Sequence, residues 1–418
     1  MDSMDIKNWA VAGAARFESV WDFTDYWKRS NTFHGFLRFV DAAAERWGDD
    51  PALVPMKNLR TAMIATNLSF FPEQMHDPKS IWADDYGWCG ISCLAARDHL
   101  LSINDQALGK RYLDIATECW QRMRDVGYDD TNSATPVRSG CGNVPPDRKS
   151  PGYFGTRNTV TNVNLLLLSL RLYTVTKEAK YLSMAFAQYL WFATWFNIKY
   201  ESLDAGRYMK AYSRKTDCLL IHERPRANKS YTQVNYPDWG TGWVWSGDQG
   251  LTMMAMAELF LMRGEFAGLP GFDPELVQRI CLFIGNGAAD LLFSKMDGVL
   301  REAPYDSSFN FDPADYVGGR GVMLRYATEA AVQQVIGKSF CPDGVKATAA
   351  AVWNSRDASN QFASLWNPKG DASFNKYFVE TWGSGDANIS SWALDLSDHY
   401  GVLQALGLDA LTAAIRLR

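Results

Sequence analysis

Apolar residues recur along most of the chain at the spacing of an α-helix. Between residues 178 and 198 they lie three or four positions apart, which places them on one face of a helix. Alternating patterns typical of strands are scarce, and only 216–222 and 297–303 are weak candidates for short ribbons. The chain is therefore predicted to be all-α. The predicted helices cover residues 34–47, 58–70, 86–102, 107–125, 158–175, 178–198, 248–263, 274–294, 320–337, 343–354, 357–366, 389–396 and 399–416.

Three long segments rich in Gly, Pro, Asn and Asp separate some of these helices, at 126–157, 199–247 and 304–319. Loops of this length within a compact fold are usually functional. Helical hairpins with long loops suit a closed ring, an (α/α) barrel, in which the loops at one end build a cleft. A helical solenoid is the alternative, but the sequence has no fixed-period repeat. Because no segment resembles a linker, we predict a single domain over residues 1–418.

Composition excludes several classes of protein. With 47% hydrophobic and 21% charged residues, the chain is predicted to be globular and not disordered. The net charge of −5, with both signs interspersed, leaves no basic face for nucleic acid. No apolar run approaches the roughly 18 residues of a membrane span, so no membrane partner is expected. We expect a monomer or weak dimer, cytoplasmic as the sequence stands and secreted if a leader has been removed.

Cysteine and histidine give no sign of a metal site. The seven Cys are scattered without a CxxC pair, and Cys89 and Cys93 lie too close on one predicted helix to form a disulfide with each other. The five His are far apart in sequence. We therefore predict neither a metal nor a cofactor. The aromatic content (16 Trp, 18 Tyr and 22 Phe) is high enough to supply faces that stack on sugar rings, although most aromatic side chains fill cores.

The strongest local signal is a pair of acids, Asp84 and Asp85, directly before an apolar helical run. Acids favour a helix N-terminus, so one interpretation is helix capping. The other is catalytic, because neighbouring helical residues project about 100° apart and their carboxyl groups can lie about 5 Å from each other. Retaining glycosidases need two carboxyl groups about 5–5.5 Å apart. Such proximity also raises the pKa of one acid, which then acts as general acid.

Aromatic residues accompany the acid pair and one long loop. Tyr86 and Trp88 flank the acids and are predicted to contact substrate. Trp239, Trp243 and Trp245 lie close together among glycines, and we interpret them as ligand-stacking residues, with packing as the alternative. The glycine-rich segments carry neither a phosphate-binding loop nor a dinucleotide fingerprint.

The acid pair belongs to a motif, Asp84-Asp85-x-x-Trp88, that resembles glycoside hydrolase family 76, the α-1,6-mannanases and related fungal wall enzymes. Three further segments are similar to motifs of that family and follow in the order it requires, over about residues 60–340. They are Arg157-Asn158-x-x-x-Asn162, Gly247-Asp248-Gln249-Gly250 and Arg320-Gly321-x-x-x-Arg325.

The resemblance implies an (α/α)6 barrel and a retaining glycosidase or transglycosidase acting on α-1,6-linked mannose. It implies Asp84 as nucleophile and Asp85 as acid/base. For Arg325 the alternative role is a structural ion pair, and for Asp248 it is a helix cap. For Asn158 and Asn162 the alternative is a bridge between helices. The residues that would bind substrate or brace the cleft are Tyr86, Trp88, Asn158, Asn162, Trp243, Trp245, Asp248, Gln249, Arg320 and Arg325.

Five positions depart from the family's pattern. Cys89 replaces a Trp, Gly247 and Asp248 replace a Tyr and an Asn, and Arg157 and Arg320 replace Lys. Arg keeps the charge but presents a planar fork, so its contacts differ from those of Lys. Two alternatives therefore stay open: an isomerase, epimerase or cyclase with a closed apolar pocket for a small molecule, and a sugar-binding protein without catalysis.

Overall fold

The computed structural model describes residues 3–22, 24–128, 140–149, 157–196, 209–210, 217–223, 244–304, 313–382, 396 and 399–417. Within these ranges the chain forms fourteen α-helices and one antiparallel ribbon of strands β1 (Met209–Lys210) and β2 (Leu220–Ile221). The helices are α1 (Ser3–Glu18), α2 (Tyr26–Trp47), α3 (Val54–His76), α4 (Ala83–Ser102), α5 (Gln106–Gly127), α6 (Thr159–Thr176), α7 (Ala179–Phe196), α9 (Ser246–Leu261), α10 (Pro274–Leu291), α11 (Pro313–Ala327), α12 (Ala330–Ile336), α13 (Pro342–Asn354), α14 (Pro368–Trp382) and α15 (Tyr400–Arg416).

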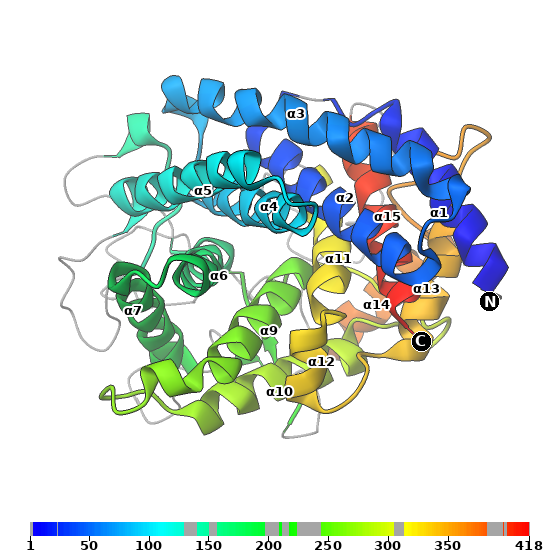
Figure 1. Cartoon of the computed structure of the whole chain (residues 1–418). Coiled ribbons are helices and arrows are strands. Elements are labelled where there is room, and N and C mark those ends of the chain that lie inside the picture. Colours follow the sequence, from blue (N-terminus) through cyan, green and yellow to red (C-terminus); the bar gives the residue numbers. More distant parts are fainter. Residues whose placement is uncertain are drawn as a thin grey trace.

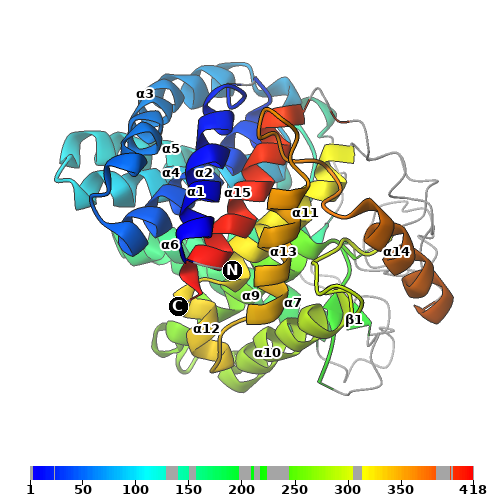
Figure 2. The same ribbon diagram turned by 90° about the vertical axis from the view of Figure 1, so that its right-hand side faces the viewer.

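Six of these helices form a closed inner ring. Helices α2, α4, α6, α9, α11 and α15 each pack against the next, and α15 packs against α2 again. Outside them lie α1, α3, α5, α7, α10 and α13, so that the chain passes alternately through an outer and an inner helix (Figure 1). Helix α14 lies at the edge of the molecule, on the right in Figure 2. The predicted (α/α)6 barrel is confirmed.

The two rings differ in sequence because they differ in burial. In the inner helix α6, every residue from Thr159 to Leu170 is buried, including an unbroken run of four leucines. The outer helix α5 buries only one face, with Tyr112, Cys119 and Met123 among its inward residues. Asp105 accepts a hydrogen bond from the Leu108 N–H at 3.0 Å and so caps the start of α5.

A buried ion pair joins three inner helices where the ring closes. Arg325 of α11 donates to both carboxyl oxygens of Asp409 of α15, at 2.8 and 2.6 Å, and to Asn31 of α2 at 2.8 Å. Gln404 of α15 also donates to the Gly13 carbonyl of α1 at 2.9 Å. We call the packing of α15 against α1 and α2 the seam of the barrel.

Most predicted helices are present, and the differences have local causes. The predicted helix 320–337 is two helices, because Glu329 takes an extended conformation and starts α12. The prediction of a helix over 357–366 is wrong: Asp357 accepts from the backbone N–H groups of Ser359 and Gln361, and Asn360 has a φ of 63°.

Other helices and strands were missed or only partly predicted, and one predicted helix lies largely outside the described residues. Helices α1 and α14 and the first two turns of α2 were not predicted. The strand candidates reduce to β2 and to an isolated bridge between Phe293 and Leu300. The predicted helix 389–396 lies outside the described residues except for Leu396. No helix in the described ranges is long and apolar enough to cross a membrane.

Candidate active site

A cavity of about 600 Å³ lies where five inner helices begin. Its lining includes residues at or next to the first turns of α2, α4, α6, α9 and α11. The N-terminus of a helix carries a partial positive charge, so this end of the barrel favours negative groups. The acids that line the cavity are Asp25, Asp84, Asp85, Glu223 and Asp315, and the aromatic residues are Tyr26, Trp27, Trp82, Trp88 and Trp245.

The predicted acid pair lies in the first turn of α4. The Asp85 Oδ2 accepts a hydrogen bond from the Trp82 N–H at 2.9 Å, so Asp85 does cap the helix. The Asp84 N–H donates to Asn143 Oδ1 at 3.4 Å. The Asp84 Oδ1 is buried and has no hydrogen-bond partner among the residues that the structure describes. Since both side chains also line the cavity, capping by Asp85 does not remove it from the site.

Both carboxyl groups hold their protons more tightly than usual. Burial, followed by the negative charge of Glu223, raises the pKa of Asp84 to about 7. Burial and then the charge of Asp84 raise the pKa of Asp85 well above its ordinary value. The pair therefore carries fewer than two negative charges at neutral pH, and Asp85 is the group that keeps its proton.

Glu223 is an acid of this cavity that sequence analysis missed. It follows β2 by two positions and is 4% exposed. Its Oε1 accepts from Asn158 Nδ2 at 2.9 Å, and its carbonyl accepts from the Thr159 N–H at 2.7 Å. No local motif surrounds Glu223 in the sequence. Only tertiary packing brings its segment to the start of α6, so sequence analysis had no signal for this residue.

Asn158, which caps the start of α6, and Asn162, within that helix, brace both sides of the cavity. Asn158 lines it and holds Glu223. Asn162 does not line it, and instead accepts from the Cys141 N–H at 2.7 Å and donates to the Cys141 carbonyl at 2.9 Å. Cys141 is two residues before Asn143, the acceptor for the Asp84 N–H. The bridging role considered for these Asn therefore describes Asn162, while Asn158 both bridges and faces the cavity.

The start of α9 supplies one lining residue and one brace. Trp245 lines the cavity, and its Nε1 donates to the Asp315 carbonyl at 3.1 Å. Gln249 accepts from the Ile221 N–H at 3.0 Å and donates to the Ile221 carbonyl at 2.9 Å, so it holds β2 two residues before Glu223. Asp248 is wholly buried in the first turn of α9, behind the lining. Trp239 and Trp243 lie outside the described residues.

Three predicted substrate contacts are corrected by the structure. Tyr86 is buried beside Tyr26, with ring centroids 6.1 Å apart, and does not line the cavity. Arg325 is buried in its ion pair with Asp409, as its structural alternative supposed. The guanidinium of Arg320 lies 3.9 Å from the ring centroid of Trp366 and lines a separate cavity of about 20 Å³. Trp88, by contrast, lines the main cavity, with its ring centroid 6.4 Å from that of Trp27.

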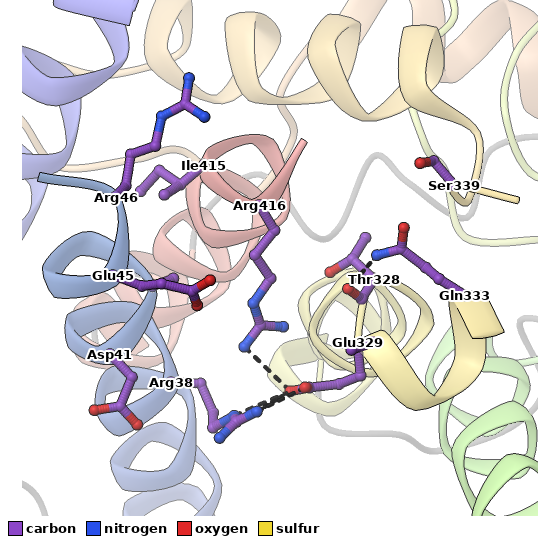
Figure 3. Close-up of a pocket in the computed structure, with 12 residues that line it drawn as sticks. Arg38, Asp41, Glu45, Arg46, Thr328, Glu329, Gln333, Ser339, Ile415 and Arg416 are labelled. Carbon is purple, nitrogen blue, oxygen red and sulfur yellow. Dashed lines mark hydrogen bonds and ion pairs between the residues drawn. The ribbon is translucent and has the colours of Figure 1, made fainter. Parts of the chain in front are cut away.

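A larger cavity, of about 870 Å³, lies near the C-terminal ends of α2, α11 and α15. Figure 3 shows Arg38 and Arg416 converging on Glu329, with N–O distances of 2.6 and 3.1 Å. Its three arginines and three acids balance in charge: Arg38, Arg46, Arg416, Asp41, Glu45 and Glu329. Because Arg38 and Arg416 are paired with Glu329 and the charges of this cavity balance, the smaller cavity with its crowded carboxyl groups is the candidate active site.

No family model matches the sequence, and no curated protein matches it either. Solved structures do match. A family 76 α-1,6-mannanase from Salegentibacter sp. HEL1_6 is 15% identical, with a TM-score of 0.55 over 98% of both chains. The family 76 mannosidase Bt3792 from Bacteroides thetaiotaomicron is 11% identical, with a TM-score of 0.57 over 99% of this chain and 98% of that one.

The chain has the fold of glycoside hydrolase family 76. The structural similarity expected from the motifs is thus confirmed over the full length. Dfg5 from Chaetomium thermophilum, solved in complex with glucosamine, has the same fold, with 14% identity and a TM-score of 0.59 over 94% of this chain and 81% of that one.

Proposed function

We propose that this chain is a retaining glycoside hydrolase or transglycosidase that acts on α-1,6-mannosyl linkages. The observation that carries the proposal is the acid pair Asp84 and Asp85, which lines one cavity beside aromatic side chains. A solved α-1,6-mannanase of the same fold supports it. That structure is an inactive variant, with two adjacent aspartates replaced by asparagine, in complex with α-1,6-mannotriose; it is 14% identical over 99% of this chain.

The two acids have different catalytic roles because they differ in protonation. Asp85, whose pKa is raised well above its ordinary value, donates its proton to the glycosidic oxygen as the bond to the anomeric carbon breaks. Because Oδ2 accepts from the Trp82 N–H, Oδ1 is the oxygen that carries this proton. Ionised Asp84 attacks the anomeric carbon and forms a glycosyl-enzyme. Asp85 then takes a proton from water or from a sugar hydroxyl, which displaces Asp84 and leaves the anomeric configuration retained.

The aromatic lining supplies the binding surface for sugar rings. Trp27 and Trp88 line the cavity together, and Trp82, 37% exposed, belongs to the same lining. Flat apolar faces of this kind pack on the C–H faces of a pyranose, while the acids accept hydrogen bonds from its hydroxyl groups.

The departures from the family's motifs do not favour another class of reaction. All five replaced positions are buried, and none of them is among the cavity-lining residues that the structure describes: Cys89, Arg157, Gly247, Asp248 and Arg320. Cys89 packs on Cys93, with the two Sγ atoms 3.9 Å apart. The replaced side chains therefore lie behind the cavity and not on the surface that a substrate would touch.

The proposal is tested by incubating the protein with α-1,6-mannooligosaccharides and following the anomeric protons by NMR. The first product expected is the α-anomer, from hydrolysis or from transfer to a second sugar. First formation of the β-anomer would contradict the retaining mechanism, and absence of turnover on mannosides of every length would contradict the proposed function.

A further inference from the structure

The indole ring of Trp245 has little room to move in the wall of the cavity. Its Nε1 donates to the Asp315 and Tyr316 carbonyls at the start of α11, at 3.1 and 3.3 Å. Its six-membered ring lies against Gly247, where a Cβ would come within 2.5 Å of two ring carbons. Gly319 likewise leaves no space for a Cβ beside Nε1. Two glycines and two carbonyl groups therefore hold the ring between α9 and α11.

The start of α9, which carries Trp245, is held by a carboxyl group from another segment. Trp245 is the N-cap residue of α9, but an indole has no oxygen with which to cap a helix. Instead, Glu302 Oε2 accepts from the Ser246 N–H at 2.8 Å, and Glu302 Oε1 accepts from the Ser246 hydroxyl. The first N–H groups of a helix lack intrahelical partners, so this carboxyl group stabilises the start of α9. Glu302 thereby fixes the backbone next to Trp245.

The segment that carries Glu302 is itself anchored to two outer elements. The Leu300 N–H donates to Thr348 Oγ1 of α13 at 2.9 Å. The buried Arg301 pairs with Asp371 of α14, with an N–O distance of 2.9 Å. Breaking a buried ion pair is costly because it leaves a charge without its partner. Glu302 therefore contacts α9 from a segment whose own position is fixed.

We propose that Glu302 and Gly247 are positioning residues for sugar binding, which together hold the indole ring of Trp245 in the cavity wall for a sugar ring to pack on. The inference rests on the proposed function and deepens it. Neither residue is among the described residues that line the cavity, so both act through Trp245. A flat apolar face that is fixed before binding loses little freedom when a pyranose packs on it, and affinity rises accordingly.

The position of Trp245 can be measured without turnover, by hydrogen exchange at its indole N–H. Protein labelled with ¹⁵N at tryptophan is followed by NMR, and the Trp245 signal is assigned by its loss in Trp245→Phe. In Glu302→Ala the exchange of this N–H should be faster by about tenfold, because the start of α9 loses its cap. The indole N–H of Trp120, which donates to Ser169 Oγ at 2.8 Å, is the internal control and should exchange at the native rate.

Three further variants separate positioning from a general loss of stability. Glu302→Gln keeps an acceptor for the Ser246 N–H, and exchange at Trp245 should stay within about threefold of the native rate. Gly247→Ala forces the ring out of its place and should speed this exchange by about tenfold or more. Asp105→Ala is the matched control: it removes the cap of α5 and should leave exchange at Trp245 unchanged.

Affinity for a sugar shows whether the position of Trp245 matters for binding. Binding of α-1,6-mannotriose is measured by calorimetry in an Asp84→Asn background, which prevents turnover. Adding Glu302→Ala should raise the Kd by about tenfold, whereas adding Glu302→Gln should change it by less than about threefold. In a protein that already carries Trp245→Ala, Glu302→Ala should have no further effect. An equal rise in both backgrounds would show that Glu302 does not act through Trp245.

Unchanged exchange at Trp245 in Glu302→Ala would overturn the proposal, and so would an equal acceleration at Trp120. Should Glu302→Ala fail to fold, Ser246→Ala decides, since it removes one of the two donors to Glu302: exchange at Trp245 faster by about threefold supports the proposal, and the native rate contradicts it. If the native protein neither binds nor turns over mannosides, the proposed function fails, while exchange still decides whether Glu302 and Gly247 hold Trp245. If it turns over mannosides and Glu302→Ala leaves KM unchanged, the proposed function stands and this inference fails.

Discussion

Asp85 combines two roles that sequence analysis treated as alternatives. One carboxyl oxygen accepts the Trp82 N–H at the start of α4, and the side chain lines the cavity. The hydrogen bond and the helix dipole both favour the ionised form. Burial and the neighbouring charge of Asp84 act in the opposite direction and prevail. A helix N-terminus can therefore hold an acid in place without ionising it.

The replacement Asp85→Asn separates the two roles. Its side-chain oxygen still accepts from the Trp82 N–H, and the substitution removes the stability cost of the raised Asp85 pKa at neutral pH, so the midpoint of thermal unfolding at pH 7.5 should not fall. By contrast, kcat on α-1,6-mannotriose should fall by about 10²–10⁴-fold because the proton donor is lost. Turnover at the native rate would reduce Asp85 to a helix cap.

The raised pKa of Asp84 should lower the free energy of unfolding at neutral pH. Its pKa is about 7 in the fold, against an ordinary value of 3.8, so between these values the folded state binds more protons than the unfolded one. The free energy of unfolding therefore falls as pH rises from about 4 to about 7. Asp84→Asn removes this loss, and should be more stable than the native protein at pH 7.5 by on the order of 1–3 kcal/mol.

Denaturant unfolding at pH 7.5 and pH 4 measures this difference. The advantage of Asp84→Asn should nearly disappear at pH 4, where the native carboxyl group is protonated in the folded state and about 40% protonated in the unfolded one. An equal difference at both pH values would show that the substitution acts by packing and not by charge.

For single residues, the sequence predicted the functional groups that are neighbours in the chain. Asp84 and Asp85 are neighbours in a recognisable motif, so they were predicted as a pair. Glu223 is far from them in sequence, in a long segment without a motif, and it meets them only because Asn158 and Gln249 fix that segment. Arg325 was misassigned because its partner, Asp409, lies 84 residues away.

Among the elements, α6 connects the two flanks of the cavity. Asn162 satisfies both backbone groups of Cys141, and Cys141 is wholly buried. In Asn162→Ala these groups lose their partners, so the free energy of unfolding should fall by about 1–3 kcal/mol. Denaturant unfolding measures this loss. Asn164, on the same helix but without a hydrogen bond between its side chain and Cys141, is the control position. A loss below about 0.5 kcal/mol in Asn162→Ala would contradict the bracing role.

Helical elements were predictable where burial follows a period, and less so where it does not. The amphipathic outer helix α5 was found to within two residues at each end. The start of α2 was missed because Lys28, Arg29, Ser30 and Asn31 are polar and yet buried. Asp357 shows the opposite error, since its side chain bonds the backbone of a segment whose apolar spacing suits a helix.

For the molecule as a whole, the inner helices α2, α4, α6, α9 and α11 all begin at the active-site cavity, and arginines gather near the C-terminal ends of the ring. The acids follow the helix dipoles, because negative groups are favoured at the starts of helices, whereas the arginines near the other end are balanced by Asp41, Glu45 and Glu329. The fold class was predictable from helical periodicity and the resemblance, whereas which charges meet inside the ring depends on three-dimensional packing.

The ion pair between Arg325 and Asp409 should contribute to stability only as a matched pair of charges. Asp409→Asn leaves Arg325 buried without its counter-charge, and should lower the free energy of unfolding by about 3–5 kcal/mol. The double replacement Arg325→Met with Asp409→Leu removes both charges and should recover most of that loss. Equilibrium unfolding of the two variants gives the comparison, and a double variant less stable than Asp409→Asn would contradict this account.

The seam has a consequence for how the protein is made. Gly13 and Gln404, which meet across it, are 391 residues apart. Helices α1 and α2 leave the ribosome before the other described helices, whereas their neighbour α15 follows all of them, so the nascent chain must keep apolar surface exposed until α15 has been made. Folding during synthesis can therefore assemble an open arc of hairpins, and the final helix turns that arc into a ring.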